Sequence, residues 1–327
     1  MILMGAMLSV LRISQSSHNT AQQGLELQQN VRAALDFVCR ELINAGNGIP
    51  YLTPLNGSPA ISVPVGAKLG PLGAAVSSGS VFFVTPCPGA GETVTKDGEG
   101  KDLATSIQTD MLVFLGGVGE ASFVNQNSPG PSAGYGATVY VENQVFTVGQ
   151  VVLITNGFQV AIGQITQTYS NGGLKFGVGQ DSLSLNPGAT QENPNPNQTA
   201  AQQVLGGPPP QVYPLATVTY FIDATTNPVH PSFKRWANTT AGAASGVTVA
   251  DDIESLQVTF LIDHDANATT AATPIWAPDA SQLSLIRGAT ISITGRSRGK
   301  TGDKNYSDGH SRLMMSQTVF FRNNIRR

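Results

Sequence analysis

The chain has 327 residues, of which 40% are hydrophobic and only 12% charged, and its net charge is −3. No apolar run reaches the roughly 18 residues that a spanning helix needs, which excludes a polytopic membrane protein, and glycine shows no three-residue period, which excludes collagen. The low charge and the abundance of Ser, Thr, Asn, Gln and Gly favour a β-rich extracytoplasmic protein over a cytosolic enzyme.

Residues 1–46 are predicted to form one long helix. Residues 1–13 are mostly apolar and are expected to lie in a membrane or in the core of a filament. Residues 14–46 are amphipathic, and we expect this part to pack on the rest of the chain. The predicted packing positions are Leu27, Val31, Leu35, Val38 and Leu42. At about 1.5 Å per residue the helix would be roughly 65–70 Å long, too long for one compact domain to cover, so its first part must contact lipid or other subunits.

Residues 47–327 are predicted to form a β-rich globular head. Short runs of β-branched and aromatic residues alternate there with Gly, Asn and Pro turns. The stretch 184–214 is rich in Pro, Asn, Gln and Gly and is predicted to be an exposed loop. The predicted strands are Ser80–Thr85, Asp110–Leu115, Ala137–Val141, Val151–Thr155, Phe158–Thr168, Val212–Ile222, Glu254–Ile262, Leu285–Thr294 and Met314–Phe321.

The two cysteines, Cys39 and Cys87, lack the spacing of a zinc site. In an oxidising compartment we expect them to form a disulfide that ties the helix to the first part of the head; two buried free thiols are the alternative.

Charge is distributed unevenly along the chain. The segment from Arg287 to Arg327 holds nine Lys or Arg residues against two Asp residues, so it carries +7. The basic stretch from Arg296 to Lys304 is the one credible nucleic-acid patch, but a solvated face explains such a charge run more often. We therefore do not expect nucleic acid as a partner.

No motif supports an enzyme. Gly295-Arg-Ser297-Arg-Gly299 has the spacing of a hydrolase nucleophile elbow, but a turn-rich loop follows it where a helix is required. The four histidines are scattered and are expected at the surface. No cofactor is expected either, although the acidic turn after the strand at 254–262 is a weak candidate for calcium. Its oxygen ligands would be Asp263, Asp265 and Asn267.

The helix and its exit carry a recognisable pattern, which is Asn30-x-Arg32-x-Ala34-Leu35-x-Phe37-x-x-Arg40-Glu41-Leu42-x-x-Ala45-Gly46. It resembles the post-membrane helix of PilW-type minor pilins of type IV pili. Further blocks that resemble the family follow in the same order, at residues 110–114, 148–166, 249–263, 286–296 and 319–323.

The resemblance implies an α+β, type IV pilin-like fold, with a long N-terminal helix and a large, mainly antiparallel β-sheet head. It also implies a structural subunit without enzymatic activity that primes or caps the pilus, held in the inner membrane with its head in the periplasm before assembly. Other pilins and minor pilins would be its partners, and the head would serve recognition or adhesion at the cell surface. The family's leader and methylated processing site are not among these residues, so we expect the reading frame to extend upstream of Met1.

Two other interpretations remain open. A type II secretion pseudopilin would share the helix and its mechanical role. A membrane-tethered secreted hydrolase or binding protein is the alternative of a different class.

Overall fold

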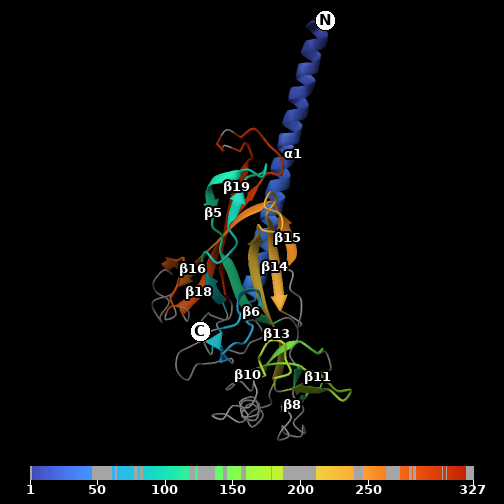
Figure 1. The fold of residues 1–327 in the computed structure, drawn as a ribbon, viewed down its shortest axis with the longest axis vertical. Coiled ribbons are helices and arrows are strands. Elements are labelled where there is room, and N and C mark those ends of the chain that lie inside the picture. The colour runs from blue at the N-terminus through green and yellow to red at the C-terminus, as the bar shows by residue number, and fades with distance from the viewer. Residues whose placement is uncertain are drawn as a thin grey trace.

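A computed structural model gives the fold as one long helix that runs into a β-rich head (Figure 1). The structure describes residues 2–45, 61–62, 65–76, 80–81, 84–117, 122–123, 137–142, 146–155, 160–177, 179–186, 211–238, 246–262, 273–279, 282, 285–303, 305–306 and 308–321.

The helix α1 spans Ile2–Ile43 without a break. It contains no proline, and its last turn carries Arg40, whose charge suits the negative end of the helix dipole. After the helix ends, Ala45 forms an isolated bridge with Gly116 in the head. The N-terminal part of α1 extends well beyond the head, and its C-terminal part lies along the strands (Figure 1).

The largest sheet has eight antiparallel strands around β13 (Gln211–Asp223). Two strands, β14 (Ser232–Asn238) and β6 (Met111–Gly117), pair with the second half of β13, while β9 (Val151–Thr155) and β7 (Ser122–Phe123) pair with its first half. The sheet is completed by β15 (Val247–Asp251) next to β14, β3 (Val84–Cys87) next to β6, and β10 (Val160–Gln164) next to β9.

A second sheet has four antiparallel strands in the order β17-β16-β18-β19. Their bounds are Thr273–Ile275 for β17, Ile253–Ile262 for β16, Ile286–Arg296 for β18 and Arg312–Phe320 for β19. Its apolar residues alternate with Ser and Thr along β18, as expected for a sheet with one buried face.

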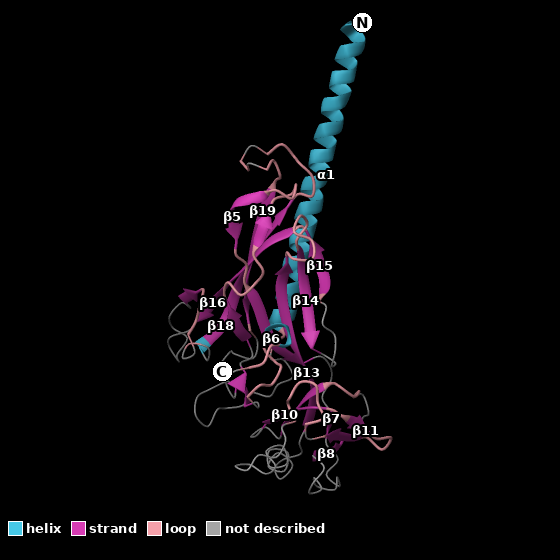
Figure 2. Cartoon of the chain, viewed as in Figure 1, coloured by secondary structure: helices cyan, strands magenta, loops and turns pink. Residues whose placement is uncertain are grey.

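Smaller elements complete the head (Figure 2). A three-stranded sheet is formed by β11 (Gln167–Thr168), β12 (Gly173–Phe176) and β8 (Ala137–Tyr140). The remaining elements are the pairs β1 (Ile61–Ser62) with β2 (Ser80–Val81) and β4 (Val94–Lys96) with β5 (Asp102–Ile107), and the short 3-10 helix η1 (Pro71–Gly73).

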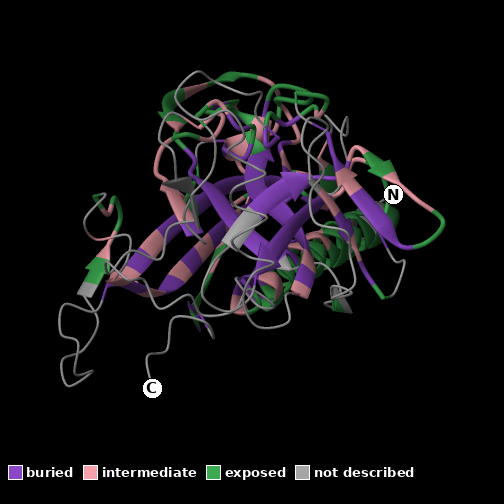
Figure 3. Ribbon diagram, turned by 90° about the horizontal axis from the view of Figure 1, so that it is seen from below, coloured by how far each residue is buried: buried purple, intermediate pink, exposed green. Residues whose placement is uncertain are grey.

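The main core joins the helix to both large sheets. It holds the apolar face of the second half of α1 together with inward residues of β6, β13, β16 and β18. In Figure 3 the buried strands form a continuous purple centre, while much of the helix is green. Helix and head therefore share one hydrophobic core in the described part of the chain.

The structure confirms an α+β protein with one N-terminal helix and antiparallel sheets, but it corrects some details. The head is not one large sheet, because its strands divide between separate sheets. The loop expected over 184–214 ends earlier, since residues 211–214 already belong to β13 and pair with β9. The strand expected over Phe158–Thr168 is two strands, β10 and β11.

Candidate functional site

The first half of α1 is the most unusual surface of the protein. Between Met4 and Ile13, six large apolar side chains are 53–72% exposed: Met4, Met7, Leu8, Val10, Leu11 and Ile13. Among the described residues of α1, the first buried side chain is that of Leu27. Searched over the described residues, no helix combines the length and the apolar character needed to cross a bilayer. A contiguous exposed apolar surface of this kind marks an interaction site.

The second half of α1 is held by the head. The five predicted packing residues are all at most 6% exposed and belong to the main core: Leu27, Val31, Leu35, Val38 and Leu42. Because they contact the sheets of their own chain, this face is not available to neighbouring helices. The surface open to partners is therefore the first half of α1 and the outward face of the second.

The helix lies very close to strand β18 at Gly295. A Cβ atom added there would lie 2.6 Å from Cγ2 of Val31 and 2.9 Å from Cδ1 of Leu27. Real Cβ contacts are longer than that, so only glycine allows the helix to lie at this depth. The turn of helix around Leu27 is thus fixed by one position in the sheet.

A polar contact fixes the other end of the buried half. Glu41 accepts hydrogen bonds from Nε of Arg235 at 2.9 Å and from the hydroxyl of Tyr220 at 2.7 Å. Burial and the Glu41 contact both raise the pKa of Tyr220, which stays protonated and a donor at any physiological pH. Both partners come from the central strands β13 and β14, so the contact sets the position of the helix along the sheet.

A buried ionic cluster lies where β16, β18 and β19 meet. The Glu254 carboxylate, 1% exposed, accepts hydrogen bonds from Arg296 at 2.8 Å and from Arg312 at 2.8 and 3.0 Å. Arg312 also binds Asp308 through two hydrogen bonds of 2.7 and 3.0 Å, and its guanidinium lies 4.5 Å from the ring centre of Tyr306. Every charge in this cluster is paired, which is the condition for burying charges in a protein.

Ion pairing in the cluster changes the pKa of Asp308 and that of Arg312. Burial would raise the pKa of Asp308, but hydrogen bonds from Arg312 and from the backbone N–H of His310 lower it to about 2. The same carboxylates raise the pKa of Arg312 against the effect of burial. Both shifts favour the charged forms, so Asp308 and Arg312 stay ionised near neutral pH.

The structure explains the hydrolase-like motif as a turn. Ser297 is 1% exposed; its hydroxyl donates to the carbonyl of Gly299 at 2.8 Å and accepts from the N–H of Ser311 at 3.0 Å. The nearby His310 binds the backbone carbonyl of Ser297 through Nδ1 at 2.8 Å, and no described base has a hydrogen bond to the hydroxyl. The geometry is that of a closed loop and not of an activated nucleophile.

The basic stretch does not form a continuous patch. Arg296 is buried in the ionic cluster, and Lys300 pairs with Glu99 at 2.6 Å. Arg298 is exposed, and Lys304 lies outside the described residues. Arg296 and Lys300, two of the residues that could have bound a phosphate, are thus already paired with carboxylates of this chain.

The structure has both cysteines as free thiols, contrary to the expected disulfide. Cys39 lies in the main core with Tyr220, whereas Cys87 packs with Phe221 in a cluster of Met111 and Trp236. Neighbouring residues of a strand point to opposite faces of the sheet, so the two sulfurs lie on opposite sides of the eight-stranded sheet. Sequence reasoning could not have detected this separation, because it depends on the register of strands distant along the chain.

The remaining expectations concern the calcium candidate and the histidines. Asp263, Asp265 and Asn267 lie outside the described residues, as does His264. Among the residues that the structure does describe, no cluster of three or more His, Cys, Asp or Glu could hold a metal ion. His310 is 2% exposed, which corrects the expectation of a surface position, while His18 is exposed on α1.

No protein-family model matches the sequence, and no curated protein is significantly similar to it. Among solved structures, a type IV-like pilin from Thermus thermophilus is similar over 55% of this chain and 87% of its own, with 9% sequence identity and a TM-score of 0.20. A TM-score of 0.20 does not support any statement about function, so the functional conclusion rests on the geometry of the helix.

Proposed function

We propose that this chain is a minor pilin-type subunit of a type IV pilus, whose first helical half packs among the helices of other pilins and minor pilins. The observation that carries the proposal is a single helix of 42 residues with two different surroundings. One face of its second half is buried by its own head, and its first half presents exposed apolar side chains that water does not stabilise. A neighbouring set of apolar helices would bury them.

The proposal extends to location and role. Before assembly the same apolar half would be kept in the inner membrane, with the head in the periplasm; after assembly the head would be displayed at the cell surface. The role is mechanical, as a subunit that primes or caps the filament. The described carboxylates of the ionic cluster are all engaged in internal ion pairs, and this agrees with a structural role.

Introducing negative charge into the exposed apolar part of the helix tests the proposal. Met7→Glu and Leu11→Glu, at positions 72% and 53% exposed, should leave the head folded and abolish pilus assembly in the producing cells, as counted by electron microscopy of surface filaments. Thr105→Glu on the exposed strand β5 is the matched control, because it adds the same charge to the head.

The outcomes distinguish the alternatives. Normal pili with impaired protein secretion would indicate a type II secretion pseudopilin. Normal pili and normal secretion in both helix variants would contradict a filament role and leave a tethered hydrolase or binding protein.

A further inference from the structure

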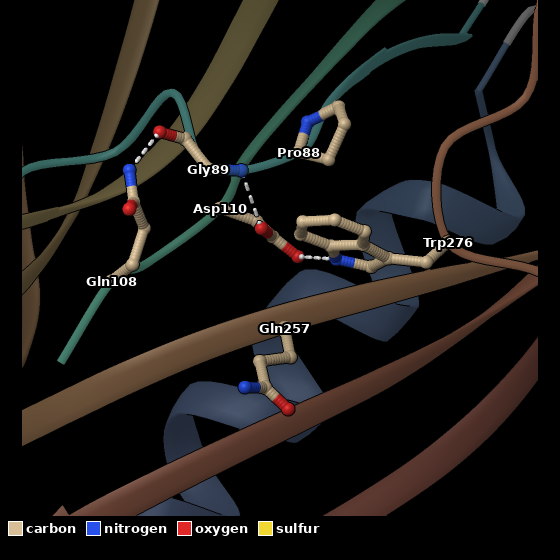
Figure 4. A pocket seen from close by; sticks show the side chains of 6 residues that line it. All are labelled: Pro88, Gly89, Gln108, Asp110, Gln257 and Trp276. Atoms are coloured by element: carbon tan, nitrogen blue, oxygen red, sulfur yellow. Dashed lines mark hydrogen bonds between the residues drawn. The ribbon is translucent and has the colours of Figure 1, made fainter.

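A surface cavity of about 620 Å³ lies between the two large sheets of the head, and none of its described lining residues belongs to α1. Its lining comes from four separate parts of the chain, brought together by the packing of the sheets (Figure 4). The lining residues are Pro88 and Gly89 after β3, Gln108 and Asp110 between β5 and β6, Gln257 on β16 and Trp276 after β17.

Asp110 fixes the tryptophan in this cavity. The carboxylate is 3% exposed; Oδ1 accepts the N–H of Gly89 at 2.7 Å, and Oδ2 accepts the N–H of Val258 at 2.8 Å and the indole N–H of Trp276 at 3.0 Å. The hydrogen bond satisfies the polar edge of Trp276 and sets the orientation of its ring. The side chain is nevertheless 54% exposed, so a large part of an oriented apolar surface remains in contact with water.

The other polar groups of the cavity are neutral. Gln257 is exposed on β16, and its side-chain amide makes no hydrogen bond to a described residue, so among these residues the amide remains available to donate and to accept. Gln108 donates from Nε2 to the carbonyl of Gly89 at 2.6 Å, which holds the side chain beside the cavity. Figure 4 shows the glutamines and the tryptophan entering from different elements around Asp110.

We propose that this cavity binds a neutral saccharide, with one pyranose ring stacked on Trp276 and its hydroxyls hydrogen-bonded to the amides of Gln257 and Gln108. The C–H face of a pyranose carries partial positive charge and suits the negative face of an indole ring. Sugar hydroxyls both donate and accept, which matches an amide better than a charged group. Because Trp276 is already held in place, binding would not have to order it.

Charged ligands fit this cavity less well. An organic cation is usually enclosed by several aromatic rings, but the described lining holds one ring, and the carboxylate oxygens of Asp110 already accept three N–H groups. An anionic sugar would meet the negative charge of Asp110, and no Lys or Arg stands among the described lining residues to offset it.

Saturation-transfer NMR with the full 327-residue chain tests the proposal. The probes are the methyl glycosides of glucose, galactose, mannose and N-acetylglucosamine, with methyl glucuronide as the anionic sugar and choline as the cation. We expect saturable binding of at least one neutral glycoside and weaker binding of the two charged probes. Trp276→Ala and Gln257→Ala should each weaken it by about tenfold or more, whereas Phe320→Ala, which removes another exposed aromatic side chain outside the cavity, should not.

Two results would overturn the proposal. One is the absence of saturable binding of every neutral glycoside by a chain whose urea-unfolding transition is intact. The other is binding that is unchanged in both Gln257→Ala and Trp276→Ala, or strongest for choline or glucuronide. Loss of binding in Trp276→Ala counts in favour only if its unfolding midpoint matches that of Phe320→Ala; otherwise Gln257→Ala decides.

Discussion

The carboxylate of Glu254 is the residue on which the buried charges of the head depend. Glu254→Gln would remove the ion-pair partner of the Arg296 guanidinium, which is 1% exposed. Breaking one side of a buried pair costs about 3–5 kcal/mol, because the remaining charge stays desolvated. We expect urea unfolding of the variant to show a loss of that order.

The exposed pair between Lys300 and Glu99 gives the matched control for this substitution. Both side chains are about half exposed, so Glu99→Gln should change the free energy of unfolding by less than about 1 kcal/mol. Equal losses in the two variants would show that Glu254 is not buried as the structure describes.

The two cysteines provide a chemical measurement at the same scale. Burial, with a smaller effect from Asp36 and Asp110 respectively, raises the pKa of Cys39 and of Cys87 from 9.0 to about 11. At pH 8 the reactive thiolate fraction is therefore about a hundredfold lower than for a thiol of ordinary pKa. Iodoacetamide should react slowly with the folded chain and should label two thiols per chain after unfolding without a reductant. If neither thiol were labelled after unfolding, the expected disulfide between Cys39 and Cys87 would be supported instead.

At the scale of elements, substituting two glycines by alanine should change the stability in opposite directions. One glycine lies where α1 contacts β18, and the other lies in an open part of α1. Gly295→Ala places a methyl group against Val31, a short and stiff side chain, and should destabilise the protein by about 1–3 kcal/mol. Gly24→Ala has no atom within 4 Å of the new methyl group and lies inside the helix, so it should stabilise by about 0.5–1 kcal/mol. Thermal unfolding of both variants measures the difference, and a neutral Gly295→Ala would mean that the helix lies less deeply on the sheet.

Element prediction from the sequence succeeded where one face is consistently apolar. The helix ends within three residues of the expected position, and β9 has the predicted bounds Val151–Thr155. Strand β14 was missed, because Lys234 and Arg235 interrupt its apolar pattern. Lys234 pairs with Asp223 on the neighbouring strand β13, and Arg235 pairs with Glu41, 194 residues away on the helix. The residues around β14 in the sequence do not indicate either pairing.

The candidate sites show the same limit more strongly. Glu254, at the centre of the ionic cluster, lay inside a predicted strand and looked like an ordinary position of it. No sequence pattern singles out Trp276, because its hydrogen-bond partner Asp110 is 166 residues away in the sequence. A site assembled from several strands becomes visible only when their register is known.

At the scale of the whole molecule, the helix divides into a half that the head needs and a half that it does not. Every described side chain from Met7 to Asn19 is exposed, and the buried positions begin at Leu27. Deleting residues 1–19 should therefore leave the urea-unfolding midpoint unchanged. It should also remove the exposed apolar surface, so the shortened chain should elute as a monomer in gel filtration, whereas the full chain associates or requires detergent.

A longer deletion is the control for this division. Removing residues 1–38 takes away four of the five predicted packing positions of the helix, including Val31 and Leu35, which are 0% and 4% exposed. Each large buried aliphatic side chain contributes about 2–5 kcal/mol relative to alanine, so the loss exceeds the total stability of an ordinary domain and the head should not fold. If the head instead folded without these residues, the shared core would not depend on the helix. If deletion of residues 1–19 left association unchanged, the contact surface would lie on the head, and the role proposed for the first half of α1 would be wrong.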